Sequence, residues 1–162
     1  MTVQHALKQA TAKLEQAGLD NPRSQAEWML QSILKLDGVG LLLNLRQALR
    51  ESEQSQLKEF LTRRLQGEPL QYILGNTEFR HLLLKTDQRA LIPRPETEGL
   101  VEIGLELVSN LEHPTILDIG TGCGAIILCL LQEKPDSIGW GMDVNQAALE
   151  LAAKNAELTG LS

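Results

Sequence analysis

The sequence predicts an α/β protein: a small N-terminal helical bundle, a hairpin connector and the first part of a parallel sheet. Apolar residues recur at helical spacing over residues 1–66, which is typical of amphipathic helices that pack against one another. Residues 115–131 read TILDIGTGCGAIILCLL. There a short run with β-branched residues, glycines at alternate positions and a longer apolar run predict a strand, a sharp turn and a helix.

The apolar stripes predict four helices in the bundle, within residues 3–17, 22–34, 41–49 and 57–65. Gly18 is placed to end the first helix. Asn21 is expected to cap the second, ahead of Pro22 in its first turn, and Asp37-Gly38 to close it. Small bundles of this kind usually serve as packing or recognition modules.

Residues 67–90 read as a hairpin connector that begins where the composition shifts at Gly67. Two short strands are expected, built from the apolar residues at positions 72–74, 79 and 82–84. His81 could be a base or a ligand, but with no second histidine nearby it is interpreted as an exposed turn residue.

The stretch LIPRPETEGLVEIGLELV, residues 91–108, predicts a rigid loop that leads into a helix. Two prolines flank Arg94 and restrict the backbone on both sides of it, and Thr97 is a good N-cap. The expected buried stripe of the helix is Leu100, Val101, Gly104, Leu107 and Val108. The loop could deliver Arg94, Glu96 and Thr97 to a functional site, or Arg94 and Glu96 could form a salt bridge in a plain connection. The spacing leaves both readings open.

The glycine turn is the candidate ligand site. Gly120, Gly122 and Gly124 let the backbone turn sharply and let a ligand approach the main chain closely. The amides at the start of the following helix are expected to be unpaired and to favour an anionic group.

A second strand and an acid complete the candidate site. Ile138–Met142 reads as a strand that ends in Asp143, and Asn145 is expected to cap the next helix. Strand, glycine turn, helix and strand make a βαβ unit with parallel neighbouring strands. Asp143 should therefore reach the crevice of the glycine turn, where a carboxylate can accept hydrogen bonds from a ribose diol.

The glycine spacing alone fits NAD and S-adenosylmethionine equally. Asp118 lies just before the turn, where a carboxylate would suit the ammonium of a methionine moiety and would repel a pyrophosphate. A helix also precedes the first strand, whereas a dehydrogenase domain commonly begins with that strand. S-adenosyl-L-methionine is therefore the expected cofactor.

Composition narrows the remaining function classes. The chain has 162 residues, 43% hydrophobic positions and a net charge of −6, which argues against broad nonspecific binding to nucleic acid or to an anionic membrane. Its two cysteines, Cys123 and Cys129, predict a reducing, cytoplasmic compartment and no metal site. Neither an export signal nor a membrane span is expected.

Four stretches together resemble the PrmC/HemK family: GEPLQYILGNTEF, LIPRPETE, ILDIGTGCGAI and MDVNQAALELAAKNAELTGL, behind a small helical domain. The resemblance spans essentially the whole chain, and PRPETE is its most distinctive part. It implies a Rossmann-like class I methyltransferase domain that begins at residue 91, with residues 1–66 as a substrate-recognition bundle. The implied reaction is methylation of the side-chain amide (N5) of the glutamine in the GGQ motif of peptide chain release factors, in translation termination.

By that resemblance Gly120, Thr121, Gly122, Cys123 and Gly124 would line S-adenosylmethionine, and Asp143 would hold its ribose hydroxyls. Cys123 is interpreted as a small packing residue and not a nucleophile. The partner implied is a release factor, with no direct binding of nucleic acid. A ribosomal-protein glutamine methyltransferase, a nucleic-acid adenine methyltransferase, an NAD-binding domain and a protein-binding module are the alternatives.

One departure from the family pattern concerns the acceptor site. The Asn-Pro-Pro-Tyr motif, whose asparagine orients the substrate amide, occurs nowhere in the sequence. The chain is accordingly interpreted as the N-terminal part of the enzyme, without a catalytic acceptor clamp and inactive alone. Residues 115–119 are then expected to show an unpaired apolar edge and uncovered faces, which predicts aggregation or partial disorder.

Overall fold

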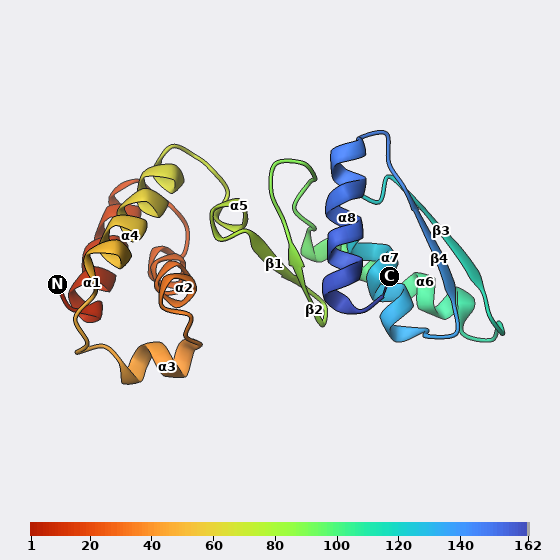
Figure 1. Ribbon diagram of the computed structural model, residues 1–162, viewed down its shortest axis with the longest axis horizontal. Coiled ribbons are helices and arrows are strands. Elements are labelled where there is room, and N and C mark those ends of the chain that lie inside the picture. Colours follow the sequence, from red (N-terminus) through yellow and green to blue (C-terminus); the bar gives the residue numbers. More distant parts are fainter. Residues whose placement is uncertain (162) are drawn as a thin grey trace. The chain divides into compact units, whose positions relative to one another are not determined.

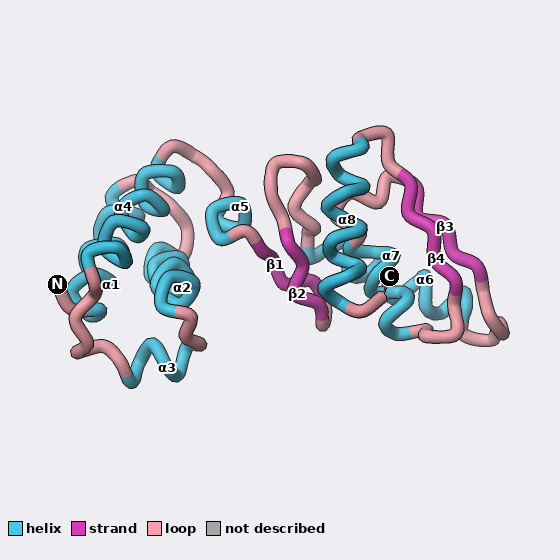
Figure 2. The backbone as a smooth tube through the Cα atoms, in the orientation of Figure 1, coloured by secondary structure: helices cyan, strands magenta, loops and turns pink. Residues whose placement is uncertain are grey.

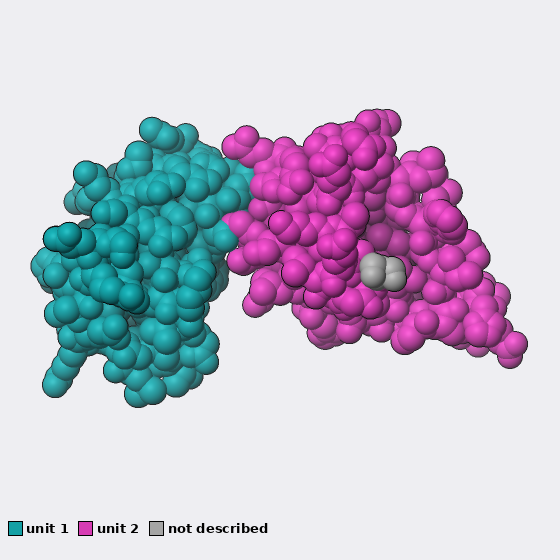
Figure 3. Space-filling model, viewed as in Figure 1, with its two compact units in different colours: residues 1–74 teal, residues 75–162 magenta. Residues whose placement is uncertain are grey.

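The computed structural model describes residues 1–161, which form two compact units divided between Leu74 and Gly75 (Figures 1 and 3). The division lies inside the predicted connector, residues 67–90, so the two ends of that segment belong to different units. Over the residues described, none of the helices is both long enough and apolar enough to cross a membrane.

Unit 1, residues 1–74, is entirely helical (Figure 2). Its helices are α1 (Val3–Gln16), α2 (Pro22–Leu34), α3 (Gly38–Leu43), α4 (Glu51–Leu65) and α5 (Leu70–Leu74). Leu14, Met29 and Leu30 are fully buried at the centre of its core, as the helical spacing predicts. Gly18 follows α1 with a φ of 69°, a conformation that glycine adopts at no steric cost.

Two boundaries in the bundle differ from the prediction. The expected helix over residues 41–49 is instead α3, because the Asp37 side chain accepts a hydrogen bond from the Gly40 amide at 2.6 Å and so caps a helix that begins at Gly38. Asn21 precedes α2 in a left-handed conformation, and its side chain makes no cap hydrogen bond.

The strand expected at residues 72–74 is wrong, because this segment belongs to α5. The amides of Tyr72 and Ile73 donate to the Pro69 carbonyl, which starts a helical turn. Leu70 and Ile73 are buried in the unit 1 core, and their spacing of three residues places both on one helix face.

Unit 2 is a mixed unit with an antiparallel hairpin and a small parallel sheet. Its elements are β1 (Asn76–Phe79), β2 (Leu82–Lys85), the 3₁₀ turn η1 (Pro95–Thr97), α6 (Glu98–Val108), β3 (Thr115–Ile119), α7 (Ala125–Glu133), β4 (Ile138–Met142) and α8 (Gln146–Thr159). The hairpin is part of the unit 2 core, where Phe79, Leu82 and Leu84 pack with Val101. His81 lies at the exposed hairpin turn, as expected.

The predicted βαβ unit is confirmed. β3 pairs with β4 in parallel, with Leu117 opposite Trp140, and α7 connects the two strands (Figure 1). A Cβ at Gly139 would lie only 2.8 Å from the Leu131 side chain, and one at Gly141 would lie 3.0 Å from that of Thr121. Glycine at these two positions of β4 therefore lets α7 and the turn before it pack closely on one face of the sheet.

The opposite face of the β3–β4 pair is open. Its large apolar side chains are 53–79% exposed: Leu117, Ile119, Ile138, Trp140 and Met142. Among the described residues β3 pairs with β4 alone, so the predicted unpaired edge is present; of the predicted uncovered faces only this one is open, because α7 covers the other. We call these five residues the open sheet face.

The predicted buried stripe of α6 is mostly wrong. Val101 is fully buried, but Leu100 is 54% and Leu107 75% exposed. α6 packs mainly on α7, where Gly104 lies against Leu130. One narrow contact line therefore leaves the flanking apolar residues of α6 uncovered.

Candidate functional site

The candidate site begins at the turn between β3 and α7. Gly120, Gly122 and Gly124 all have positive φ, at 81°, 57° and 87°, a region that side chains with a Cβ rarely adopt. A Cβ at Gly120 would meet no atom within 4 Å, whereas one at Gly124 would meet Ala152 of α8 at 3.3 Å. The start of the turn therefore faces open space, and its end is packed against α8.

Asp143, which follows β4, converges on this turn. Its Oδ2 accepts a hydrogen bond from the Gly122 amide at 2.9 Å, and its Oδ1 accepts one from the Asn145 amide at 2.9 Å. These two amide donors, Asn145 first, hold the pKa of the Asp143 carboxyl below its ordinary value. A carboxylate therefore stands at the glycine turn at neutral pH, where the sequence placed it.

The amides of the turn itself are paired within the chain, whereas the prediction of unpaired donors concerns the first amides of α7, which begins at Ala125. The amides of Gly120 and Thr121 donate to the Met142 carbonyl at 2.7 and 2.8 Å, and that of Gly124 donates to the Thr121 carbonyl at 2.8 Å. The chain itself satisfies these donors because β4 ends directly beside the turn.

Two side chains of the turn point into the protein. Thr121 is 7% and Cys123 2% exposed, and the Thr121 hydroxyl donates to Asp118 Oδ2 at 2.8 Å. These residues can thus offer a ligand only their backbone. Asp118 is half-buried beside the turn.

Both cysteines are buried and reduced. Burial raises the pKa of the Cys123 thiol and raises that of Cys129 to about 11. Neither thiol forms a ready nucleophile at neutral pH, which agrees with a packing role for Cys123.

The PRPETE loop is exposed at its charged positions. Arg94 and Glu96 are both exposed, and Thr97 stands at the start of α6 without a side-chain cap hydrogen bond. The 3₁₀ turn η1 occupies the position where the sequence predicts a capped helix start, so the α6 backbone begins from a tighter turn instead.

Two residues near the site were not predicted from the sequence. Val144 is fully exposed directly after Asp143, so it presents an apolar surface beside the carboxylate at the tip of β4. Asn155 is completely buried on the packing face of α8, with Ala148 and Leu151. A polar residue within an apolar helical stripe is a recognisable signal for a buried hydrogen-bond network.

The site combines glycines after one parallel strand with an acid at the end of the neighbouring strand. α/β domains bind nucleotide-containing cofactors with this arrangement. Comparison with known families narrows this class. The PrmC N-terminal domain matches residues 5–75, and the methyltransferase small domain matches residues 101–162.

Curated relatives extend these matches along the chain. The release factor glutamine methyltransferase of Deinococcus radiodurans is 37% identical over 161 residues, which cover 99% of this chain and 58% of that protein. The protein of the same name from Vibrio cholerae is 41% identical over 156 residues, which cover 96% of this chain and 54% of that protein. This chain therefore belongs to the PrmC/HemK family, and it spans about half the length of the curated relatives it matches.

Proposed function

We propose that this chain belongs to an S-adenosylmethionine-dependent enzyme that methylates the glutamine side-chain amide (N5) in the GGQ motif of peptide chain release factors, in the cytoplasm. The observation that carries the proposal is the convergence of Asp143 on the glycine turn, at 2.9 Å from the Gly122 amide. The names of the relatives, release factor glutamine methyltransferases, support the reaction and the protein substrate.

The residues present fit S-adenosylmethionine. Each carboxylate oxygen of Asp143 accepts one backbone amide and keeps a lone pair for a ribose hydroxyl. Val144, exposed beside it, offers an apolar surface to the adenine ring. Gly120, Gly122 and Gly124 give the cofactor access to the main chain, and Thr121 and Cys123 contribute backbone alone.

Charge favours this cofactor over NAD. Asp118 puts a carboxylate next to the turn, and S-adenosylmethionine carries a sulfonium and an ammonium, whereas NAD carries a pyrophosphate; Asp143 suits the ribose of either cofactor. Like charges at such short range cost free energy and opposite charges gain it. When bound, the cofactor supplies an electrophilic methyl group, and the residues of this chain orient it.

The remaining assignments extend this proposal to the rest of the chain. Residues 1–66 serve as the substrate-recognition bundle for the release factor, and residues 91–162 form the start of the Rossmann-like domain. The segment between them, residues 67–90, contributes α5 to unit 1 and the hairpin to unit 2. The sequence holds no Asn-Pro-Pro-Tyr, so we expect this chain alone to bind cofactor weakly and to form no N5-methylglutamine on a purified release factor.

Calorimetric titration with S-adenosylmethionine tests the site. Asp143→Ala removes the ribose acceptor, and we expect its affinity to fall at least about ten-fold, since a charged hydrogen-bond partner is lost. Asp136→Ala is the matched control, because Asp136 bonds to His113 and Lys134 away from the turn. Equal affinities for Asp143→Ala and the unmutated chain would remove Asp143 from the site.

A further inference from the structure

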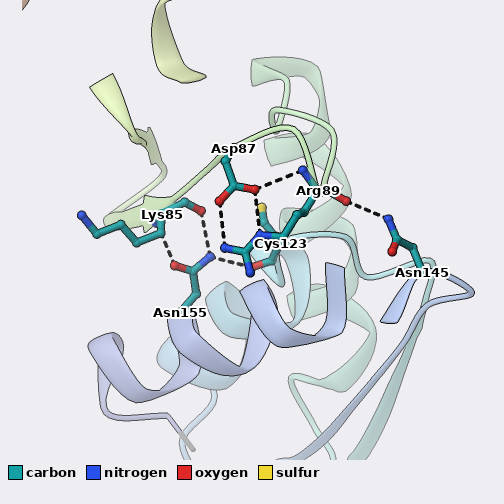
Figure 4. Close-up of polar contacts among 6 residues, drawn as sticks. All are labelled: Lys85, Asp87, Arg89, Cys123, Asn145 and Asn155. Carbon is teal, nitrogen blue, oxygen red and sulfur yellow. Dashed lines mark hydrogen bonds and ion pairs between the residues drawn. The ribbon is translucent and has the colours of Figure 1, made fainter. Parts of the chain in front are cut away.

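The buried amide of Asn155 joins three segments of unit 2 that are far apart in the sequence (Figure 4). Its Oδ1 accepts from the Lys85 amide at 2.7 Å, and its Nδ2 donates to the Lys85 carbonyl at 3.0 Å and to the Cys123 carbonyl at 2.8 Å. Lys85 ends β2, Cys123 lies in the glycine turn, and Asn155 itself is on α8. One side chain therefore bonds both backbone groups of a strand end and one carbonyl of the turn.

Asparagine is the side chain that this position requires. Asn155 is 0% exposed, and its carboxamide satisfies an amide and two carbonyls, which needs one acceptor and two donors. Aspartate has no donors when ionised, and leucine of similar shape has neither donors nor acceptors. Loss of the amide would leave buried backbone groups unpaired, which is costly.

The bond to Cys123 acts directly on the conformation of the turn. The Cys123 carbonyl shares its peptide plane with the Gly124 amide, which donates to the Thr121 carbonyl at 2.8 Å. Fixing that carbonyl therefore fixes the orientation of the last peptide before α7. Ala152, one turn before Asn155 on α8, would lie 3.3 Å from a Cβ at Gly124, so α8 supports the turn at two points.

A second asparagine, Asn145 at the N-cap of α8, holds the same upstream segment. Asn145 Nδ2 donates to the Arg89 carbonyl at 3.1 Å, and Arg89 is in turn held by a two-point ion pair with Asp87. Ala90, the next residue, lies 3.8 Å from the position of a Cβ at Gly122. The segment of residues 85–90 is thus fastened to α8 at both ends and runs beside the glycine turn (Figure 4).

We infer that Asn155 is a positioning residue for cofactor binding: through the Cys123 carbonyl and Lys85 it holds the glycine turn and residues 85–90 in the binding-competent arrangement. The inference deepens the proposed function and rests on it. Pre-organisation of this kind lowers the cost of binding because the turn does not need to be ordered by the ligand.

Asn155→Leu tests this role while it keeps the volume of the side chain, and Asn155→Ala is the second variant should leucine disturb packing. We expect S-adenosylmethionine to bind about ten-fold more weakly, the effect of roughly one unsatisfied buried hydrogen bond. Amide hydrogen exchange should accelerate at Lys85 and Gly124. Val101→Ala is the matched control, since it removes buried apolar volume from the same core without a hydrogen bond to the turn.

The outcomes separate a positioning role from general stabilisation. A variant that loses thermal stability like Val101→Ala but keeps its affinity, or keeps slow exchange at Gly124, overturns the inference. Undetectable binding by the unmutated chain contradicts the cofactor assignment instead. In that case the exchange rates at Gly124 still decide whether Asn155 holds the turn.

Discussion

The two units of this chain differ in how completely they cover their apolar residues. Helices α1, α2 and α4 of unit 1 pack around one core, in which Leu14, Met29 and Leu30 are fully buried. The β3–β4 pair of unit 2 is covered by helices on one face, and its open sheet face exposes Trp140 at 64% and Ile119 at 79%.

The difference follows from the kind of secondary structure in each unit. A helix has one apolar stripe, and three or four helices can bury their stripes against one another. A parallel sheet has two apolar faces and is normally covered on both. The core of the helical unit is therefore closed by its own elements, although α3 leaves Leu42 and Leu43 exposed, whereas the second face of the sheet in unit 2 is uncovered.

The largest expected contrast is between two Leu→Ala substitutions. Leu30→Ala empties a fully buried site in unit 1 and should cost about 2–5 kcal/mol of unfolding free energy. Leu117 is 53% exposed on the open sheet face, so Leu117→Ala should cost less than about 1 kcal/mol. Urea titrations followed by fluorescence resolve the units when each is recorded on a chain that keeps one tryptophan, because Trp28 lies in unit 1 and Trp140 in unit 2. Equal losses would contradict the difference between the units.

The open sheet face should drive self-association, because large exposed apolar patches and unpaired strand edges associate. We expect Trp140→Ser with Ile119→Ser to lower the weight-average mass in analytical ultracentrifugation towards the 17.9 kDa of one chain. Leu43→Ser is the control, since Leu43 is 80% exposed but lies in unit 1. If Leu43→Ser lowered the mass as much, the sheet face would not be the cause.

A smaller effect is expected at Arg80, which ties the hairpin to α7. Its guanidinium bonds to both Glu133 oxygens at 2.7 and 3.0 Å, and the Arg80 side chain is 13% exposed. We expect Arg80→Ala to cost unit 2 about 1 kcal/mol. Arg23→Ala in unit 1, which breaks an exposed pair with Glu27, should cost less than about 0.5 kcal/mol. Urea denaturation at low salt measures both losses of unfolding free energy. High salt should reduce both losses.

The smallest expected effect is the loss of stability at acidic pH. Arg89 holds the pKa of Asp87 below its ordinary value of 3.8, and backbone amides do the same for Asp143; in unit 1, Arg63 lowers the pKa of Glu68. A carboxyl whose pKa is lowered on folding adds stability above its unfolded pKa and loses it as pH falls through the folded value. Unit 2 should therefore lose stability below about pH 4. Asp87→Asn should flatten that loss, and an unchanged slope in melting experiments between pH 5 and pH 3 would contradict the assignment.

Local patterns were enough to predict the elements that position the candidate site. β3, β4, the glycine turn and the approach of Asp143 follow from apolar runs, alternate glycines and the geometry of a βαβ unit. The strand predicted at residues 72–74 was wrong because a three-residue apolar run fits a strand or a helix equally. The hydrogen bonds from the Tyr72 and Ile73 amides to the Pro69 carbonyl favour the helix.

Tertiary contacts account for what the sequence left out. The partners of Asn155 lie 70 and 32 positions away in the sequence, beyond any local pattern. The pairing of the turn amides with Met142 depends on where β4 ends in space. Leu107 is exposed because α6 packs mainly on α7 and the rest of its surface is left uncovered.

The central claim is that the glycine turn and Asp143 form one pocket for S-adenosylmethionine. The most direct test is the amide resonance of Gly122, whose N–H donates to Asp143 Oδ2, in nitrogen-15 spectra recorded during titration of the purified chain. We predict that S-adenosylmethionine shifts the Gly122 resonance in a saturable manner and that NAD at the same concentrations does not. A saturable shift with NAD, or none with S-adenosylmethionine while the chain remains folded, would contradict the claim.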